Sequence, residues 1–451
     1  MNQSVELYQM LEARERRAFA QQRLLAQFHR PVLCFTMNIP GPVKDTPLIR
    51  RAFLWGREAL EHRLPKGSVL FSQVLTQVTG CEAVYAVDME PVSLKRLTTS
   101  IEDETPLGRL FDMDVLDISG VKLDRALVAG KSRDCIVCGA PGRGCASRRS
   151  HSIAELQRSS NRLMRQHFAQ ADAERIGALA TQSLLDEVCT TPKPGLVDRR
   201  NSGSHRDMDI FTFMASAAAL SPYFTRCAQI GMDTGSLPPE ETFRRLRAAG
   251  LRAEQEMYAA TGGVNTHKGA IFTMGILCGA AGRLWDPAAA WAEGALFDEV
   301  SAMTKAAMAA DLSQKGSDTV GRRLYAKQGI CGIRGEVARG LPSVRTIGLP
   351  AFRAYREAGQ DPNMAGALTL LHLIAQVEDT NMIARGGREG AAQGAAWAGA
   401  LLRHDRLPTP AELEELDSRF IRQNLSPGGC ADLLAAVYFV DRLSSEKTAN
   451  P

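Results

Sequence analysis

The chain changes character near residue 165, and this change limits what it can fold into. Downstream of about Ala171, segments rich in Ala, Leu, Glu and Arg recur at helical spacing, with few runs of Val, Ile and Thr between them. Upstream, short runs of β-branched and aromatic residues alternate with helical segments. We therefore predict a multidomain chain, with an α+β N-terminal domain over residues 1–165 followed by an all-α C-terminal domain over residues 166–451.

The expected elements can be placed along the sequence. In the first half we expect strands at residues 31–37, 82–87 and 111–116 and helices at residues 6–28 and 47–61. A basic segment at residues 147–165 is expected to be helical and to join the halves. In the second half we expect helices at residues 176–188, 210–228, 239–260, 288–310, 362–377, 389–403, 410–425 and 430–443. The apolar segment 270–282 is far shorter than the roughly 20 residues of a membrane span, so we expect a buried helix there.

The composition argues against several classes of protein. A net charge of +4 over 451 residues is too small for a protein that binds nucleic acid through a concentrated basic surface. The ten cysteines are scattered and residues 1–17 are polar, which is typical of a reduced chain without a secretion signal. We expect a cytoplasmic protein with no nucleic-acid partner and no membrane partner.

The stretch from Glu187 to Asp209 concentrates polar chemistry directly before a predicted helix. It holds four carboxylates, two prolines, two glycines, Lys193 and His205. Helix N-termini favour anions, and Asp207 and Asp209 offer the hard oxygen ligands that Mg²⁺ prefers. The stretch therefore predicts a site for a metal and the phosphates of a nucleotide. The alternative is that the Asp-x-Asp pair only caps the helix.

Three further segments of the second half combine glycines with charged residues. The first segment contains His267 and Lys268, the second contains Arg334 and Glu336, and the third contains Glu378, Asp379 and Arg385. Glycines let the backbone approach a ligand closely, Lys and Arg bind phosphates, and carboxylates bind Mg²⁺. Taken singly, each segment could be a packed histidine, a helix C-cap or a solvated helix face. Four such segments in one helical half favour a shared site.

These motifs together resemble one family. Thr191–Asp198, Asp207–Asp209, Gly263–Gly269, Arg334–Glu336 and Glu378–Gly387 resemble the triphosphoribosyl-dephospho-coenzyme A synthase family, over about residues 170–445. This family serves citrate lyase, and a sister branch serves malonate decarboxylase. Ser204 stands where the family pattern leads us to expect Ala.

The resemblance implies a reaction between ATP and 3′-dephospho-coenzyme A. The 2′-hydroxyl of 3′-dephospho-coenzyme A would attack C1 of the ATP ribose, so that adenine leaves and the triphosphate stays attached. On residue chemistry, Glu336 would be the general base or would stabilise the cation-like transition state. Mg²⁺ would be held by Asp207, Asp209, Glu378 and Asp379. The phosphates would be bound by Lys193, His205, His267, Lys268, Arg334 and Arg385.

The first half carries a second set of chemical residues. Asp112 and Asp114 alternate along a predicted strand, so both side chains share one face and can reach a single Mg²⁺. Arg109 precedes them, and Lys44 ends an Asn-Ile-Pro-Gly-Pro-Val-Lys segment. Paired carboxylates beside Arg and Lys suit phosphoryl or nucleotidyl transfer. The alternative is a polar outer face of the strand.

A cysteine-rich segment follows. Cys135, Cys138, Cys145 and His151 stand in an order that zinc can use. The step from Cys138 to Cys145 is short for a regular zinc module, which favours plain reduced thiols over zinc. Arg148 and His151 are expected to bind a phosphate or diphosphate instead.

The first-half motifs resemble a second family. Glu12–Arg16, Asn38–Lys44, Phe111–Val115 and Cys145–His151 resemble the apo-citrate lyase phosphoribosyl-dephospho-coenzyme A transferase family, over about residues 4–160. That family transfers the phosphoribosyl-dephospho-coenzyme A unit to a serine of the acyl carrier (gamma) subunit of apo-citrate lyase and releases diphosphate. The Mg²⁺ interpretation of Asp112 and Asp114, as catalytic and metal-binding residues, gains support from this resemblance.

The two resemblances together predict a bifunctional, Mg²⁺-dependent transferase that builds and attaches the citrate lyase prosthetic group. One half would make the triphosphate donor and the other would consume it. Two alternatives remain open: a metal-dependent hydrolase of nucleotides or ADP-ribose, and a non-catalytic maturation factor of citrate lyase.

Overall fold

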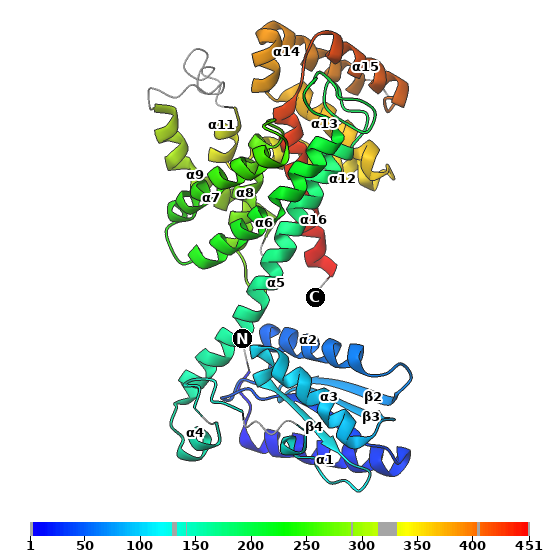
Figure 1. Cartoon of the computed structure of the whole chain (residues 1–451), viewed down its shortest axis with the longest axis vertical. Coiled ribbons are helices and arrows are strands. Elements are labelled where there is room, and N and C mark those ends of the chain that lie inside the picture. Colours follow the sequence, from blue (N-terminus) through cyan, green and yellow to red (C-terminus); the bar gives the residue numbers. More distant parts are fainter. Residues whose placement is uncertain are drawn as a thin grey trace. The chain divides into compact units, whose positions relative to one another are not determined.

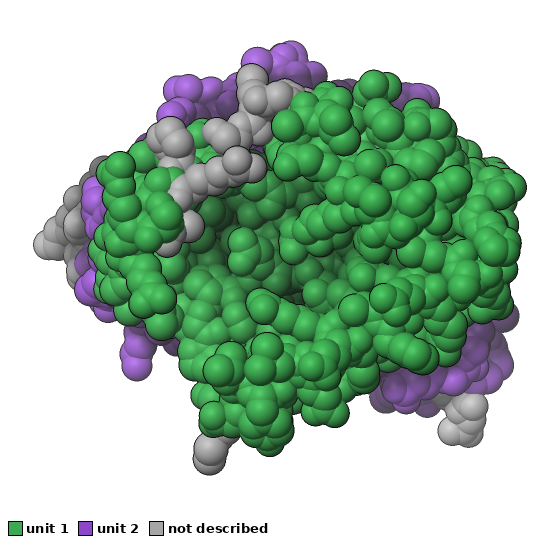
Figure 2. All heavy atoms as spheres, turned by 90° about the horizontal axis from the view of Figure 1, so that it is seen from below, with its two compact units in different colours: residues 1–169, 287–289 green, residues 170–286, 290–451 purple. Residues whose placement is uncertain are grey.

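The computed structural model describes residues 3–128, 133–140, 142–289, 292–313, 332–403 and 406–449. The chain divides into two compact units, drawn in different colours in Figure 2. Unit 1 comprises Met1–Ala169 with Pro287–Ala289, and unit 2 comprises Gln170–Asp286 with Ala290–Pro451. None of the helices in the described ranges has the combined length and apolar character needed to cross a bilayer.

Unit 1 is built on a small antiparallel sheet with the strand order β2-β3-β1-β4. Helix α1 covers one face of the sheet, and helices α2 and α3 cover the other (Figure 1). The strands are β1 (Val32–Met37), β2 (Val69–Gln77), β3 (Gly80–Val87) and β4 (Phe111–Leu116). The helices are α1 (Leu7–Phe28), α2 (Pro47–Arg63) and α3 (Pro91–Glu104), followed by the 3₁₀ turns η1 (Pro106–Leu110) and η2 (Arg125–Leu127) and by α4 (Gly142–Arg148).

The alternation of side chains along β1 assigns the two faces. Phe35 points to the α2 side, where its ring stacks on Phe53 at 4.8 Å and meets the edge of Phe111 at 5.2 Å. Cys34 points to the α1 side and packs with Leu24. Both faces are therefore covered, and any polar residue on the α1 face must find a partner there.

Unit 2 consists of helices wherever its described residues have an assigned element. Helix α5 (Ile153–Cys189) begins in unit 1 and continues into unit 2, so the predicted helices at 147–165 and 176–188 are largely one element. The other helices are α6 (Ile210–Thr234), α7 (Pro239–Ala260), α8 (Lys268–Arg283), α9 (Glu293–Ser313), α11 (Gly332–Ala338), α12 (Leu349–Glu357), α13 (Pro362–Gln376), α14 (Thr380–Leu402), α15 (Pro410–Arg422) and α16 (Gly428–Ala449), with a π-helical turn η3 (Val344–Gly348) before α12.

Helix α8 is the buried helix that the apolar segment 270–282 predicted. Nearly all of its residues from Ala270 to Gly282 are buried. It packs against α6, α7, α9 and α16, so it is apolar on every side, as expected of a helix enclosed by others. Its N-terminus is therefore held in place by the core of unit 2.

Helices α6 and α8 cross with almost no space between their backbones. A Cβ atom on Gly282 would lie 2.1 Å from the carbonyl oxygen of Ala228 on α6. A Cβ atom on Gly231 would likewise lie 2.1 Å from the carbonyl oxygen of Gly279 on α8. Only glycine permits this approach, since the atoms met are backbone atoms that cannot rotate away.

We therefore expect Gly282→Ala to lower the stability of unit 2 by about 1–3 kcal/mol through overpacking. Thermal unfolding followed by circular dichroism measures the change. Gly294→Ala is the matched control, because its new Cβ would meet only the end of the Arg345 side chain, at 3.7 Å. Equal stability of the two variants would contradict the tight crossing.

Candidate functional site

The loop between α5 and α6 carries the first cluster of polar residues that the sequence singled out, and it is fixed by buried hydrogen bonds. Gly195 has a φ of 70°, and a Cβ there would lie 2.2 Å from the carbonyl oxygen of Leu425. Its N–H donates to Asp417 Oδ1 at 2.9 Å. The Asp198 carboxylate accepts from the N–H of Lys193 at 3.0 Å and of Arg200 at 2.7 Å. These contacts turn Lys193 into the interior.

Lys193 is a fully buried cation. Its side chain is 1% exposed, and its Nζ lies 2.5 Å from Glu187 Oε1 on the last turn of α5. Burial raises the pKa of Glu187, and the Lys193 charge opposes that rise. Buried ion pairs of this kind are weak sources of stability, so their presence in a core calls for another reason.

The charge of Lys193 acts on the His267 side chain. Burial, assisted by Lys193, lowers the pKa of His267 to about 3, so the imidazole is neutral at pH 7. Thr266 Oγ1 donates to Ser216 Oγ at 2.8 Å, and His267 Nδ1 lies 2.8 Å from the same oxygen. Among the described residues the buried His267 Nε2 has no hydrogen-bond partner, so it is available to bond to a ligand.

The N-termini of α8 and α16 meet beside this pair. His267 is the N-cap of α8, and Asp432 lies in the first turns of α16. A Cβ on Gly269 would lie 1.9 Å from Asp432 Oδ2, and the Asp432 carboxylate accepts the N–H of Ala270. Burial, with the charges of Glu187 and Asp379, raises the pKa of Asp432 well above its usual range. Helix N-termini attract anions, so this point suits phosphate groups.

Asp379 connects the N-terminus of α16 to that of α14. It caps α14, where its Oδ1 accepts from the N–H of Asn381 at 2.7 Å and of Met382 at 3.1 Å. Its Oδ2 accepts the N–H of Cys430 in α16 at 2.8 Å. Burial nevertheless raises the pKa of Asp379. The three N–H donors make it an anchor of the N-termini of α14 and α16.

Glu336, on α11, lies near the N-terminus of α16, where its charge acts on Cys430. It is buried, and its carboxylate accepts from the N–H of Ser343 at 3.1 Å and from the Ser343 hydroxyl at 2.9 Å. Its charge contributes to the raised pKa of Cys430, which burial dominates. Two hydrogen bonds fix its orientation, as a positioned general base requires.

Two pairs of predicted phosphate ligands also lie together. Lys268 Nζ is 2.8 Å from Glu254 Oε2, and the charge of Arg334 acts on it. Arg385 Nη2 is 3.2 Å from His205 Nδ1, while His205 Nε2 is 2.9 Å from Ser426 Oγ. Burial, with the Arg385 charge, lowers the pKa of His205.

The remaining predicted metal ligands of the second half lie on the surface. Asp207, Asp209 and Glu378 are exposed. Asp209 is the N-cap of α6 and forms a capping box with Thr212, which is the alternative that the sequence left open for it. The hydrogen bonds from Thr212 lower the pKa of Asp209.

Sequence reasoning missed two carboxylates, Glu187 as a partner of Lys193 and Asp432. Both had a signal. Glu187 begins the polar stretch before α6, and Asp432 follows the Gly428-Gly429 pair that opens α16. Neither signal shows that Glu187 and Asp432, which are 245 residues apart in the sequence, lie close enough for their charges to interact.

The acidic residues beside Lys193 suit a divalent cation. Burial raises the pKa of Glu187, Asp379 and Asp432, and the charges of Glu187 and Asp379 raise that of Asp432 further, so a bound cation would favour the charged carboxylates. Mg²⁺ typically takes one or two carboxylates and completes its shell with water and substrate phosphates. Asp432, with one N–H donor named above, has more free lone pairs for this than Asp379.

In unit 1, Asp112 and Asp114 share one face of β4, as their alternation predicted. They pair in register with Thr36 and Cys34 of β1 on the face that α1 covers. Burial and the neighbouring Asp114 charge raise the pKa of Asp112. Lys122 Nζ lies 2.6 Å from Asp114 Oδ2. Two carboxylates that repel each other fit a cation between them.

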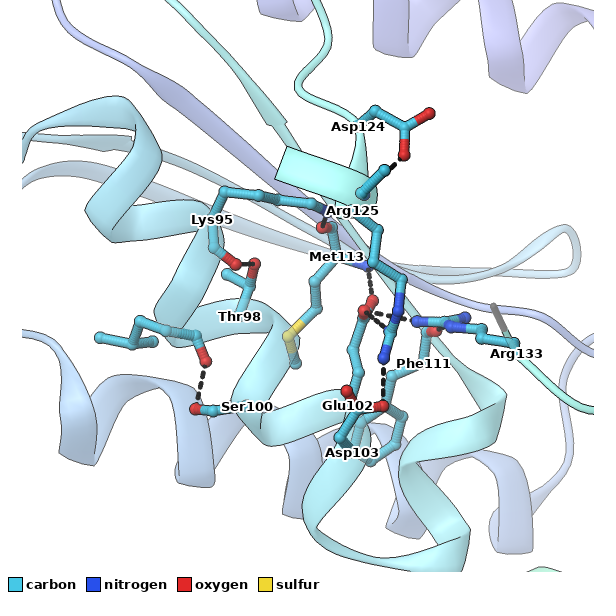
Figure 3. Close-up of polar contacts among 12 residues, drawn as sticks. Lys95, Thr98, Ser100, Glu102, Asp103, Phe111, Met113, Asp124, Arg125 and Arg133 are labelled. Atoms are coloured by element: carbon cyan, nitrogen blue, oxygen red, sulfur yellow. Dashed lines mark hydrogen bonds and ion pairs between the residues drawn. The ribbon is translucent and has the colours of Figure 1, made fainter. Parts of the chain in front are cut away.

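A cavity of about 960 Å³ lies at the end of this sheet, where β1 ends and β4 begins. Figure 2 shows that the surface of unit 1 is hollowed. The wall is rich in cations, since it includes Arg109, Arg125, Arg133 and Arg149. Arg125 Nη1 and Arg133 Nη2 both reach Glu102 Oε2, at 3.0 and 2.5 Å (Figure 3). Such a wall suits phosphate groups.

The other residues of unit 1 that the sequence singled out are Lys44, Arg148 and the cysteine-rich segment, and they lie in different surroundings. Lys44 Nζ donates to the carbonyl oxygen of Ile39, and burial with the charge of Arg14 lowers the pKa of Lys44. Arg148 is exposed, while Arg149 beside it lines the cavity. The ligand atoms of the cysteine-rich segment converge within 4.8 Å.

Comparison with known proteins decides the family. A curated protein named CitXG from Haemophilus influenzae is 35% identical over 460 residues, which cover 96% of each chain. A second CitXG protein, from Leuconostoc mesenteroides subsp. cremoris, is 31% identical over 463 residues and 97% of each chain. The chain belongs to the CitXG family.

The two halves match separate models within this family. Residues 5–167 match the model "Apo-citrate lyase phosphoribosyl-dephospho-CoA transferase", and residues 173–451 match "ATP:dephospho-CoA triphosphoribosyl transferase". A 2-(5''-triphosphoribosyl)-3'-dephosphocoenzyme-A synthase from Klebsiella pneumoniae is 40% identical over 276 residues, which cover 59% of this chain and 90% of the relative. Like other CitXG proteins, the chain is an enzyme with transferase domains.

Proposed function

We propose that this enzyme makes and attaches the prosthetic group of citrate lyase. In unit 2, ATP and 3′-dephospho-coenzyme A would give 2′-(5″-triphosphoribosyl)-3′-dephospho-coenzyme A and adenine. The observation that carries this proposal is the buried pair of Lys193 and His267, whose Nε2 has no partner among the described residues, beside the N-termini of α8 and α16. The names of the relatives and family models support the substrates.

The residues of unit 2 divide the work. Lys193, His267 and the N–H groups at the start of α8 would bind the triphosphate, with Lys268, Arg334 and Arg385 at its edge. Asp432 and Asp379 would hold Mg²⁺, which supplies positive charge to the phosphates when bound. The 2′-hydroxyl oxygen would form the bond to C1 of the ribose as the bond to adenine breaks, and the hydroxyl proton would pass to a carboxylate.

Glu336 is our candidate for that carboxylate. We expect Glu336→Gln to lower the rate of adenine release by about 100-fold or more, with ATP binding unchanged, because the amide keeps the shape but cannot accept the proton. Adenine is measured by chromatography and ATP binding by calorimetry. The exposed Glu256→Gln is the matched control. Full activity of Glu336→Gln would remove Glu336 from the reaction.

In unit 1, the phosphoribosyl-dephospho-coenzyme A unit would pass to a serine of the acyl carrier subunit. The serine oxygen would attack the phosphorus nearest the ribose, and diphosphate would leave. Asp112 and Asp114 would hold Mg²⁺, and the arginines of the cavity wall would bind the phosphates. The name of the matching family model supports this acceptor.

The test is mass spectrometry of the full chain with ATP, 3′-dephospho-coenzyme A and Mg²⁺. One adduct per adenine supports the first reaction, and a mass gain of added apo-carrier with release of diphosphate supports the second. ADP, phosphate or ribose phosphate as products would favour a nucleotide hydrolase. A non-catalytic maturation factor would be favoured if the chain formed no product and if the Asp112→Asn and Asp432→Asn variants still supported the maturation of citrate lyase. Comparing the carriers of citrate lyase and malonate decarboxylase identifies the acceptor.

A further inference from the structure

Four side chains of unit 1 that the proposed reactions leave unused converge in space. One ligand atom each from Cys135, Cys138, Cys145 and His151 lies within 4.8 Å of the others. Cys138 Sγ and Cys145 Sγ are 3.5 Å apart. In a tetrahedral site with Zn–S bonds of about 2.3 Å, two sulfurs lie roughly 3.8 Å apart. The short step in sequence from Cys138 to Cys145 is bridged by a turn and by helix α4, which brings the two thiols together.

The Cys135–Gly139 turn is shaped to present two sulfurs. The N–H of Gly139 donates to the carbonyl oxygen of Cys135 at 2.9 Å, and Gly139 has a φ of 72°, which favours glycine. The N–H of Val137 points back to Cys135 Sγ at 3.4 Å. The N–H of Cys138 also donates to Cys135 Sγ. Backbone donors of this kind stabilise a thiolate, the form that binds metal.

The fourth residue of the cluster has an unsatisfied atom. His151 Nε2 is buried, and it has no hydrogen-bond partner within the described ranges. A buried polar atom without a partner is costly, and native structures rarely keep one. A metal ion at the centre of the cluster would satisfy it.

We propose that unit 1 binds one structural Zn²⁺ ion through Cys135, Cys138, Cys145 and His151. Three thiolates and an imidazole select zinc over Mg²⁺, and four protein ligands leave no open position for catalysis. The ion fixes the wall of the cavity, because Cys135, Cys145 and His151 all line it. Arg149 lies two residues before the ligand His151 and lines the same cavity. The ion would therefore also hold Arg149 in place.

A disulfide does not account for the cluster. A bond between Cys138 and Cys145 would need the sulfurs about 2.05 Å apart, and it would leave Cys135 and the orphan His151 nitrogen without a role. All three cysteines are free.

The test is metal analysis of the full chain, purified under reducing conditions without added metal. We expect about one equivalent of zinc per chain, and below about 0.1 equivalents in Cys138→Ser and Cys145→Ser. Cys189→Ser, which removes a free cysteine of unit 2, is the control and should keep its zinc. Iron in place of zinc, or zinc retained in both variants, would overturn the proposal.

A second measurement on the unaltered chain covers the case in which the variants do not fold. Removing zinc with a strong chelator should expose three additional reactive thiols, and Co²⁺ added to that protein should give the intense visible absorption of tetrahedral thiolate coordination. Two results together would contradict the zinc site. The three thiols would already react, or form a disulfide, in the protein as purified, and the protein would take up neither Zn²⁺ nor Co²⁺.

Discussion

Replacing Lys193 by Met is expected to reduce adenine release by about 1,000-fold, the loss typical of removing one well-placed donor to developing or fixed negative charge. Lys193 is the buried cation beside His267 and the N-termini of α8 and α16. Met keeps most of the side-chain volume and removes only the charge. Chromatography of adenine measures the rate, and transfer by unit 1 from supplied triphosphoribosyl-dephospho-coenzyme A should be unchanged.

The same substitution should also weaken the fold, so the two effects must be separated. Glu187 would be left as a buried carboxylate, which costs about 3–5 kcal/mol. The double variant Lys193→Met, Glu187→Gln removes that charge and should regain stability in urea unfolding while remaining inactive. Activity regained together with stability would mean that Lys193 acts only in the fold.

The pH dependence of the single variant has a definite sign. Burial holds the pKa of Glu187 above its ordinary value of 4.5, so the folded variant binds a proton that the unfolded chain has lost. Its stability is therefore greatest below pH 4.5 and falls as the pH rises toward the folded pKa, by about 1.4 kcal/mol per pH unit. The double variant should lack this slope.

Replacing Asp112 by Asn should abolish carrier modification, with a loss of about 1,000-fold, and leave adenine release unchanged. The stability of unit 1 should stay the same or rise, since burial and repulsion from Asp114 already disfavour the charged form. A loss of activity without a loss of stability is expected of a functional carboxylate. The mass of the added apo-carrier measures the transfer.

Asp88→Asn is the matched control for this experiment, because Asp88 pairs with Arg30 in an exposed ion pair. It should transfer at the rate of the unaltered chain. Wild-type transfer by Asp112→Asn would exclude Asp112 from the reaction, and a parallel loss of adenine release would indicate a general folding defect.

Much of the fold follows from periodicity in the sequence. The predicted strands at 31–37, 82–87 and 111–116 correspond to β1, β3 and β4, and the predicted helices at 6–28 and 47–61 to α1 and α2. Strand β2 and helix α3 escaped prediction. Most residues of β2 are exposed, because it is an edge strand, so no strong apolar alternation marks it. In α14, Gly387 has a φ of 69°, which places a kink where the Gly-Gly pair suggested a helix end.

The site was harder to predict than the fold. Sequence spacing can show that Asp112 and Asp114 share a strand face, because the period of two is local. It cannot show that Asp432 meets Gly269 or that Lys193 turns inward, since helix packing decides both. Asp209 could be a cap or a ligand on sequence grounds, and the structure shows it accepting the N–H of Thr212 as the N-cap of α6.

Helix α5 matters to anyone who wishes to separate the two halves. The family models end at residue 167 and resume at residue 173, which is within one uninterrupted helix. Phe168 is buried in unit 1 and Ala173 in unit 2, so a cut between them removes hydrogen-bonded turns from both. A division of the chain at this point would therefore leave each half with a shortened helix.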